Sequence, residues 1–347
     1  MEGVEYIDVI TDKFTKIKAV QYGCGPIGCS VVRFAATRPD IELVGAVDIA
    51  PDLQGKDIGE IAGVGRKLNV KISDQAKALL ARTKPDIVFI TTSSSLKKTF
   101  PQLETCLKAG VAVVSTCEEL AYPYRKDPEL SDKLDKLAKA NKAALLGTGI
   151  NPGFMMDSWP LFMTGVCQKV DHVKAIRYQD ASSRRGPFQK KIGAGCTMDE
   201  FKAKVAEGSL RHVGLAESIA MIAAGLGWEL TDITETIEPV IAKKPVKTEF
   251  VEVKPGQAAG VRQIGTGFMK GKEVITLEFE AAVGANESYD SVVITGSPNM
   301  NVTVKGGTHG DIATAAIVVN SAKRVIAAPP GLVTMKDLPI VTAMGTK

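Results

Sequence analysis

Two adjacent carboxylates in the turn Cys117-Glu-Glu119 are the residues best suited to acid–base chemistry. They follow an apolar stretch, residues 111–116, and like charges so close together raise each other's pKa unless a cation binds between them. An ammonium or iminium group of a substrate would be such a cation, which makes Glu118 and Glu119 candidate catalytic residues. Acids are also typical of the start of a helix, where the helix dipole attracts negative charge. The residues alone leave both interpretations open.

A glycine pattern nearer the N-terminus predicts a dinucleotide site. Gly23-Cys-Gly25-Pro-Ile-Gly28 has the spacing G-x-G-x-x-G and lies between a strand pattern and a helix pattern. In that context Gly23 permits a tight turn, Gly25 lets a pyrophosphate approach the backbone, and Gly28 lets the helix pack closely on the sheet. Together with Pro26 and Ile27 they form a turn whose free N–H groups would face the phosphates.

Asp48 ends the next apolar stretch, residues 41–48, and lies 20 residues beyond Gly28. A carboxylate at this distance can accept hydrogen bonds from the adenosine ribose hydroxyls. The same charge would repel the 2′-phosphate of NADP, so the sequence predicts NAD as the cofactor. Arg66 and Lys67 are close enough in sequence to keep NADP as a second candidate. The alternative is an ordinary structural turn in which Asp48 caps a helix.

The other turns after predicted strands supply further candidate contacts to the cofactor, because ligands of open parallel sheets bind beyond the carboxyl ends of the strands. Hydroxyl residues in such turns would serve equally well as helix caps, and a cysteine there would also suit a packing position. The candidates are Thr91, Thr92, Ser93, Cys117, Asn151 and Pro152.

Two sets of residues lead to two different predictions for the substrate. A basic, glycine-rich loop could bind the carboxylate of an amino acid through Arg184, Arg185 or Lys190. An apolar pocket for a simple alkyl amine would instead be built from Phe154, Met155, Trp159 and Tyr178. A further pocket candidate, His309, precedes the last predicted helix. The sequence does not decide between the two substrate classes.

The elements that must position these residues change character near residue 150. Up to that point strands alternate with helices, which predicts an α/β fold with a doubly wound parallel sheet of the Rossmann type in a dinucleotide-binding domain, residues 1–150. The predicted strands are 18–22, 41–48, 70–72, 85–92, 111–116 and 143–149. The predicted helices are 29–36, 75–82, 99–109 and 128–141, and residues 1–15 are expected to lead into the first strand.

Residues 151–307 are predicted to form a second, α+β domain on an open, mostly antiparallel sheet, which would bind the substrate and could mediate dimerisation. Its expected helices are 197–207 and 214–224, and its strands are 170–179, 234–241, 259–270, 273–282 and 288–294. A long apolar helix, residues 310–325, lies in the last segment, 308–347, which is expected to complete the first domain.

Composition restricts the classes of partner. The 347 residues carry a net charge of +4 without a charged block, and no run of about 18 apolar residues is present, so neither nucleic acid nor a membrane is expected. The N-terminus lacks the basic flank and apolar core of a signal peptide, so the cytoplasm is the expected location. The six cysteines form no C-x-x-C pair and no cluster with the three histidines, so no metal site is predicted.

Four motifs in order resemble the 2,4-diaminopentanoate dehydrogenase family and the native amine dehydrogenases related to it. They are VSTCEELAYP at 114–123, GINPGFMMD at 149–157, QKKIGAG at 189–195 and GDIATAAIVVN at 310–320. The nucleotide half also resembles dihydrodipicolinate reductase. This resemblance implies NAD(P)-dependent oxidative deamination of a primary amine to a carbonyl compound and ammonia, and reductive amination in reverse. A homodimer is expected.

The resemblance also implies that a glutamate in the turn after the fifth strand contacts the amine. Glu118 is preferred over Glu119 because the chain resembles homoserine dehydrogenases here, and their catalytic lysine falls on position 118. Two other functions remain open. One is a C=N or C=O reductase without ammonia exchange, similar to dihydrodipicolinate reductase or homoserine dehydrogenase. The other is a nucleotide-sensing protein without catalysis.

Overall fold

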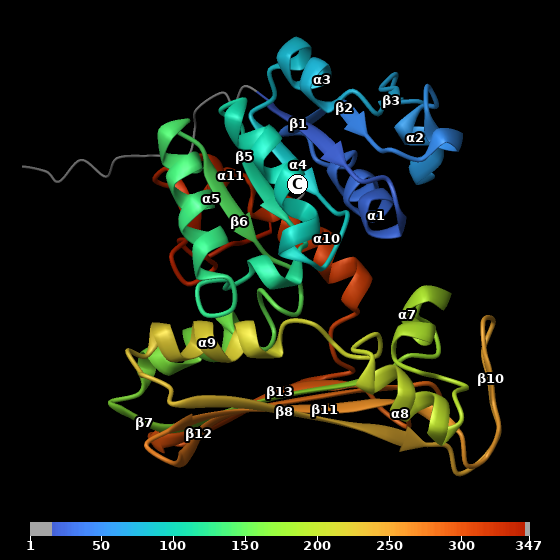
Figure 1. Cartoon of the computed structure of the whole chain (residues 1–347), viewed down its shortest axis with the longest axis vertical. Coiled ribbons are helices and arrows are strands. Elements are labelled where there is room, and N and C mark those ends of the chain that lie inside the picture. The colour runs from blue at the N-terminus through green and yellow to red at the C-terminus, as the bar shows by residue number, and fades with distance from the viewer. Residues whose placement is uncertain (1–15, 344–347) are drawn as a thin grey trace, which may run out of the picture.

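The computed structural model describes residues 16–343 and contains two large β-sheets, and the strands of the first run end-on toward one face of the second (Figure 1). The predicted leader, residues 1–15, lies outside the described residues. Each sheet has its own apolar core. The chain passes from the first sheet to the second after residue 147 and returns to the first sheet near residue 310.

The first sheet has seven parallel strands in the order β15-β6-β5-β4-β1-β2-β3. Its central strands are buried on both faces, which explains their continuous apolar sequences. The predicted Rossmann-type sheet is therefore confirmed, with one short strand added from the C-terminal segment. The strands are β1 Ile17–Tyr22, β2 Ile41–Val47, β3 Ile72–Ser73, β4 Ile87–Ile90, β5 Ala112–Ser115, β6 Ala144–Gly147 and β15 Gly331–Val333.

Helices cover both faces of this sheet. One face packs against α3 (Ala76–Thr83), α4 (Leu96–Lys108) and α5 (Pro128–Ala140). The opposite face packs against α1 (Pro26–Ala35), α10 (Gly310–Asn320) and α11 (Ala322–Ile326). The alternation of side chains along β4 supplies both cores, because Val88 and Ile90 face one layer while Ile87 and Phe89 face the other.

The last helix differs from the prediction of one continuous element over 310–325. It divides into α10 and α11 at the buried Ser321, whose hydroxyl donates a hydrogen bond to the carbonyl oxygen of Ile317 at 2.6 Å. Such a bond from a serine back to the preceding turn commonly bends a helix.

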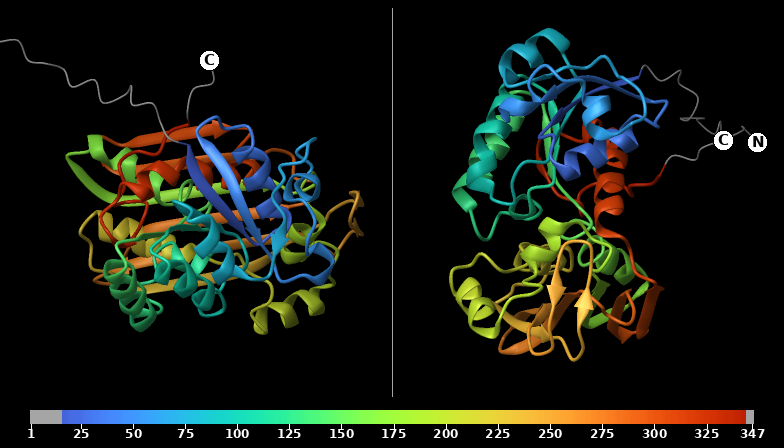
Figure 2. Two further views of the ribbon diagram at one scale, coloured as in Figure 1. Left: turned by 90° about the horizontal axis from the view of Figure 1, so that it is seen from above. Right: turned by 90° about the vertical axis from the view of Figure 1, so that its right-hand side faces the viewer.

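The second sheet has six strands in the order β14-β13-β7-β12-β11-β8. Neighbours are antiparallel except β7 and β12, so the predicted mostly antiparallel sheet is confirmed. One face packs on α8 (Met198–Ala206) and α9 (Leu215–Gly225), and the other face is open in the views of Figures 1 and 2. The strands are β7 Lys169–Asp180, β8 Asp232–Ile241, β11 Ala258–Met269, β12 Lys272–Ala282, β13 Tyr289–Ser297 and β14 Met300–Lys305.

Several short elements were not predicted, because segments of two to six residues carry little periodic signal. They are α6 Ser158–Met163, α7 Gly186–Lys191 and the hairpin of β9 Val246–Lys247 with β10 Glu252–Val253. A loop and a short helix were expected over residues 49–63, and α2 Ile58–Ala62 forms there. Helix α7 matters most for the site, because it lies inside the basic loop from which a carboxylate-binding residue was expected. No helix among residues 16–343 is long and apolar enough to cross a bilayer.

Candidate active site between the two sheets

The strand register brings the predicted ligand-binding turns to one edge of the first sheet. Tyr22, the last residue of β1, pairs with Val47 of β2 and with Ile90 of β4. Ile90 pairs in turn with Ser115, which pairs with Gly147 of β6. The turns that follow these strands therefore lie side by side, as the rule for parallel sheets requires.

The glycine turn after β1 fits a dinucleotide phosphate group. Gly23 has a φ of +92°, and a Cβ atom on Gly28 would lie 1.9 Å from the carbonyl oxygen of Gly23. At Gly25, by contrast, a Cβ atom would meet nothing within 4 Å, so the backbone surface there is open. No side chain caps the N-terminus of α1, which leaves its first N–H groups available to an anion.

Asp48 lies beside this turn at the end of β2. Its carboxylate accepts hydrogen bonds from the backbone N–H groups of Cys24, at 2.6 Å, and Ala50, at 2.9 Å. These bonds tie the glycine turn to the end of β2 and hold the negative charge where a ribose would bind. Thr91 supports the turn from β4, because its hydroxyl donates to the carbonyl oxygen of Gly23 at 3.0 Å.

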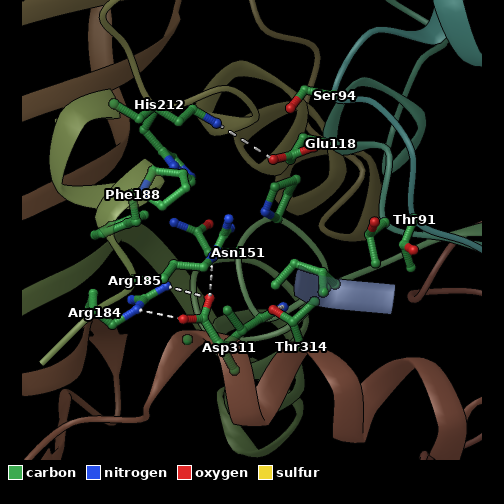
Figure 3. A pocket seen from close by; sticks show the side chains of 18 of the residues that line it. Thr91, Ser94, Glu118, Asn151, Arg184, Arg185, Phe188, His212, Asp311 and Thr314 are labelled. Atoms are coloured by element: carbon green, nitrogen blue, oxygen red, sulfur yellow. Dashed lines mark hydrogen bonds and ion pairs between the residues drawn. The ribbon is translucent and has the colours of Figure 1, made fainter. Parts of the chain in front are cut away.

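A cavity of about 340 Å³ lies between the end of the first sheet and the buried side of the second (Figure 3). Both halves of the chain contribute to its wall, as do the start of α7 and the N-terminal turn of α10. Of the residues predicted to form the site, the cavity brings together Ile27, Thr91, Thr92, Ser93, Glu118, Asn151, Pro152, Arg184 and Arg185.

Glu118 and Glu119 have different surroundings. The carboxylate of Glu118 lines the cavity and lies 3.9 Å from the ammonium group of Lys191. Glu119 points away from the cavity, and its carboxylate accepts a hydrogen bond from the backbone N–H of Leu96 and one from Lys126, both at 2.7 Å. Burial raises the pKa of Glu119, but these hydrogen bonds outweigh it and hold the pKa below its ordinary value. Glu119 therefore has the surroundings of a helix-capping acid, whereas Glu118 lies at the cavity.

Four basic side chains line the cavity, and each faces a carboxylate. Arg177 is almost fully buried and pairs with Asp290 at 2.8 Å; burial lowers the pKa of Arg177 to about 10, although Asp290 opposes this. Arg184 and Arg185 share Asp311, at 3.0 and 3.3 Å, as Figure 3 shows. The fourth is Lys191, which faces Glu118. Positively and negatively charged side chains thus lie next to each other around the cavity.

The structure places several predicted site residues elsewhere. Lys190 is exposed, and the neighbouring Lys191 is the lysine of α7 that lines the cavity. Tyr178 lies on the open face of the second sheet, where it stacks on Tyr289, because side chains alternate along β7 and Arg177 takes the inner face. The apolar candidates Phe154, Met155 and Trp159 do not line the cavity either.

Cys117 and His309 also have roles other than those expected. Cys117 is buried in the core beneath α4, its thiol donates to the carbonyl oxygen of Ser94, and burial raises its pKa to about 12. His309 caps α10 by accepting a hydrogen bond from the backbone N–H of Ile312 at 3.5 Å. With Pro26 it lines a separate cavity along α1.

Four titratable residues of the cavity were missed by sequence reasoning: Arg177, Lys191, His212 and Asp311. Lys191 belongs to the basic loop that was singled out, but its neighbour Lys190 was named as the candidate in its place. Arg177 and His212 stand in sequence contexts that are common for core or surface residues. Asp311 lies in the motif at 310–320, but that motif was interpreted only as the start of a helix. Among residues 16–343 no group of three or more potential metal ligands occurs.

Two family models match the chain in the order of its two sheets. The dihydrodipicolinate reductase N-terminal model covers residues 17–119, and the 2,4-diaminopentanoate dehydrogenase C-terminal domain model covers residues 154–347. The 2,4-diaminopentanoate dehydrogenase of Acetoanaerobium sticklandii is 32% identical over 335 residues, which are 95% of each chain. An amine dehydrogenase of Streptomyces virginiae is 25% identical and covers 95% of this chain and 98% of its own.

A solved structure shows the same fold throughout. The amine dehydrogenase from Mycobacterium smegmatis superposes with a TM-score of 0.85 at 29% sequence identity, over 94% of this chain and 97% of that one. The match therefore spans both large sheets. As its sequence motifs predicted, the chain belongs to the 2,4-diaminopentanoate dehydrogenase family of oxidoreductases.

Proposed function

We propose that the protein catalyses the reversible oxidative deamination of a small amino acid with a second amino group, of the 2,4-diaminopentanoate type. The family relationship supports an oxidoreductase that acts on CH–NH2 groups. A nicotinamide dinucleotide is the cofactor for which the glycine turn and the free N-terminus of α1 are suited. The observation that carries the substrate class is the wall of the cavity, which combines Glu118 with four basic side chains.

The basic side chains favour a substrate with a carboxylate. Arg177, Arg184, Arg185 and Lys191 outnumber the three acids that they face, which are Asp290, Asp311 and Glu118. A carboxylate bound among them would balance the remaining positive charge, and arginine forks match its geometry. The residues that were expected to form an apolar pocket for an alkyl amine lie outside the cavity.

Glu118 is the group that would act on the reacting amine. In oxidation a bound nicotinamide would supply the acceptor for the hydride that leaves the amine-bearing carbon of the substrate. The carboxylate of Glu118 stabilises the substrate iminium cation that remains, and then accepts a proton from the attacking water. In the reductive direction the same carboxylate assists the addition of ammonia to the carbonyl carbon of the substrate. It then assists the loss of water from the adduct. Lys191, whose ammonium group lies 3.9 Å from Glu118, would balance the charge of Glu118 before the substrate binds.

The surroundings of Asp48 favour NAD over NADP. The carboxylate is held by two backbone N–H groups at the ribose position, where it would repel a 2′-phosphate. The basic residues that kept NADP open point elsewhere, because Arg66 donates to the carbonyl oxygen of Ala36 and Lys67 pairs with Glu60.

Two observations favour a second candidate function, the deamination of a simple alkyl amine. Phe188 and Phe279 line the cavity and supply apolar surface, and two of the relatives are named amine dehydrogenases. Arg184, however, lies over the ring of Phe188, at 4.0 Å from its centroid, and so brings charge to that surface.

Steady-state kinetics with a panel of carbonyl compounds test the proposal. Oxidation of NADH and of NADPH would be followed with 2-amino-4-oxopentanoate, 4-oxopentanoate, pentan-2-one and short aldehydes, each with and without ammonia. We expect ammonia-dependent turnover with the two acids to exceed that with pentan-2-one. Turnover without ammonia would instead indicate a simple C=O reductase, and turnover of pentan-2-one alone would indicate an alkyl amine dehydrogenase.

A further inference from the structure

Lys126 connects the two halves of the molecule outside the cavity described above. Its ammonium group lies 2.7 Å from a carboxylate oxygen of Glu119, on the side of the first sheet, and 3.9 Å from one of Glu217. Glu217 belongs to the first turn of α9, which packs on the second sheet and faces the loop before α5 (Figure 1). Lys126 and Glu217 line a separate cavity of about 390 Å³. One cation thus faces a carboxylate from each half.

Glu217 carries a buried acid that depends on this cation. Its side chain is only 5% exposed, and among residues 16–343 Lys126 is the only cation within 4 Å of its carboxylate. Burial raises the pKa of Glu217, while its own backbone N–H and Lys126 oppose this rise. The negative charges of Glu119 and Glu235 add to it. Glu235 is already paired with Arg211 at 2.9 Å, so Arg211 does not replace Lys126.

Both ends of this contact continue into the wall of the active-site cavity. Glu118 directly precedes Glu119 in the turn after β5. At the other end, Gly214 begins α9 so close to Pro152 that a Cβ atom would lie 2.4 Å from the proline ring. Pro152 and His212, two residues before Gly214, both line the cavity. A movement of α9 away from the turn would therefore change the separation between Glu118 and the opposite wall.

We propose that Lys126 is a positioning residue that acts as the shared counter-ion of Glu119 and Glu217. It thereby holds the turn that carries Glu118 at a fixed spacing from α9. Without Lys126, two like charges would oppose each other across the boundary between the halves, and the buried Glu217 would lose its cation. Lys126 itself contacts neither substrate nor cofactor. Its effect on turnover rests on the proposed function, because turnover is measured with that reaction.

The alternative is an ordinary surface ion pair, which contributes little. The side chain of Lys126 is 49% exposed, but those of Glu119 and Glu217 are only 17% and 5% exposed. Removal of the cation from a buried carboxylate is costly even where the cation itself reaches solvent. The two interpretations predict different values of kcat at a temperature well below the melting temperature.

Replacing Lys126 by Met removes the charge and keeps most of the length of the side chain. At pH 8, with 4-oxopentanoate and ammonia, we expect kcat of K126M to fall about 10- to 100-fold, as for reacting groups that are slightly misplaced. The dissociation constant of NADH should be unchanged, because the glycine turn lies at the end of β1. Lys126→Arg keeps the positive charge and should keep kcat near wild type. An ordinary ion pair predicts wild-type kcat in K126M as well.

A second replacement separates charge from packing. Glu217→Gln removes one of the two like charges, so K126M/E217Q should recover most of the kcat that K126M loses. E217Q alone should stay near wild type, because Lys126 still balances Glu119. Arg125→Met removes a neighbouring cation of the same cavity and is the matched control, with wild-type kcat expected. A double variant no better than K126M would overturn the proposal, and this comparison also decides the matter if K126M alone folds poorly.

The dependence of kcat on pH provides a further test. The charged groups around Glu217 are Lys126, Glu119, Glu235, Arg211 and Arg125. Lys126 lowers the pKa of Glu217, so its loss raises that pKa further, and the carboxyl group of K126M takes up a proton as the pH falls. The repulsion then disappears. The ratio of kcat in K126M to kcat in wild type should therefore rise from pH 9 to pH 6, whereas the ratio for K126M/E217Q should stay constant. A constant ratio for K126M would contradict the proposal.

Hydrogen–deuterium exchange measures the contact without turnover. In K126M we expect faster exchange in residues 118–127 and in α9 but not in α8, and K126M/E217Q should return to the wild-type pattern. If wild-type protein shows no ammonia-dependent turnover but exchange changes in this way, the proposed reaction fails while the role of the contact stands. If turnover of the acid is normal and K126M keeps either the wild-type kcat or the wild-type exchange, the reaction stands and the role of Lys126 is wrong.

Discussion

Glu118 and Glu119 are adjacent in the chain, but their carboxylates have different partners. Glu118 lines the cavity opposite Lys191, whereas Glu119 is bound by the first N–H of α4 and by Lys126. A carboxylate that already accepts two strong hydrogen bonds is poorly placed to respond to a substrate cation. At the scale of single residues, the surroundings therefore assign the two acids to different tasks.

Replacing Glu118 by Gln should lower kcat by about 100- to 10,000-fold, because the carboxylate that stabilises the iminium cation and accepts a proton is lost. The dissociation constant of NADH, measured by fluorescence titration, should be unchanged. Glu119→Gln is the matched control: it keeps an acceptor for the N–H of Leu96 and should keep kcat near wild type, with a loss of folding free energy below about 1 kcal/mol. Loss of turnover in E119Q with normal turnover in E118Q would reverse the assignment.

Replacing Asp48 by Asn should weaken the preference for NADH over NADPH by about tenfold or more, because the charge that repels the 2′-phosphate is removed. Asparagine can still accept one of the two backbone hydrogen bonds that Asp48 makes, so the turn should persist. The measurement is the ratio of kcat/KM for the two cofactors. An unchanged ratio would mean that a group other than Asp48 distinguishes the 2′-hydroxyl of NADH from the 2′-phosphate of NADPH.

His212 should make the stability of the fold depend on pH. Its pKa in the folded protein is depressed, mainly by burial, so the native state stays neutral while the unfolded chain takes up a proton below pH of about 6.5. This contribution is complete above that pH and is lost as the pH falls, by at most about 1.4 kcal/mol per pH unit. Urea unfolding at pH 5 and pH 8 should show a smaller loss in H212Q than in wild type. Equal losses would contradict the buried neutral state.

At the scale of elements, the direction of a side chain follows from the period of its helix or strand. Strand β7 sends Arg177 to the cavity and Tyr178 to the open face, because neighbours alternate. In α7, successive side chains turn by about 100°, which brings Lys191 to Glu118 and leaves Lys190 in solvent. A shift of one residue thus separates a cavity residue from a surface residue.

Replacing Lys191 by Met should raise KM for the amino acid substrate about tenfold, because one of the four cations of the cavity is removed. Lys190→Met is the matched control on the same short helix, and its kinetic constants should match those of wild type. Initial rates with 4-oxopentanoate and ammonia measure the difference. The assignment from the geometry of α7 would be wrong if K190M showed the larger effect.

At the scale of the whole molecule, the open face of the second sheet is a candidate dimer interface. It carries apolar and paired charged side chains in one band, in which Ile176 and Ile264 flank Glu278 across three strands. Glu278 is bound by Lys174 at 3.1 Å. Within residues 16–343 no helix packs on this face in Figures 1 and 2, and we propose that a second copy of the chain covers it.

A charge placed on this face should disrupt such a dimer. We expect Ile176→Glu to convert a dimer into monomers in light scattering coupled to size-exclusion chromatography, because it brings a second carboxylate beside Glu278. Val166→Glu, at an exposed position off the sheet, is the control and should keep the wild-type mass. If I176E keeps that mass too, the open face is not the interface.

Prediction from sequence was most complete for the glycine turn and the strands around it. The spacing of Gly23, Gly25 and Gly28, the acid Asp48 and the buried strands lie within short segments, and the rule for parallel sheets then brings their ends together. The order of sheets and most long helices followed from the same local periodicities. Shorter elements, such as α7, and the break at Ser321 depend on individual contacts and were not predicted.

The sequence by itself determined that a dinucleotide turn, a pair of acids and a basic loop exist, because each is a pattern of neighbouring residues. Only the tertiary structure decided which acid lines the cavity, which lysine lies beside that acid, and that His212 and Asp311 share the cavity with them. These choices depend on how α7, α9, α10 and the second sheet pack against the first. Contacts between segments so far apart in the chain leave no local periodic trace in the sequence.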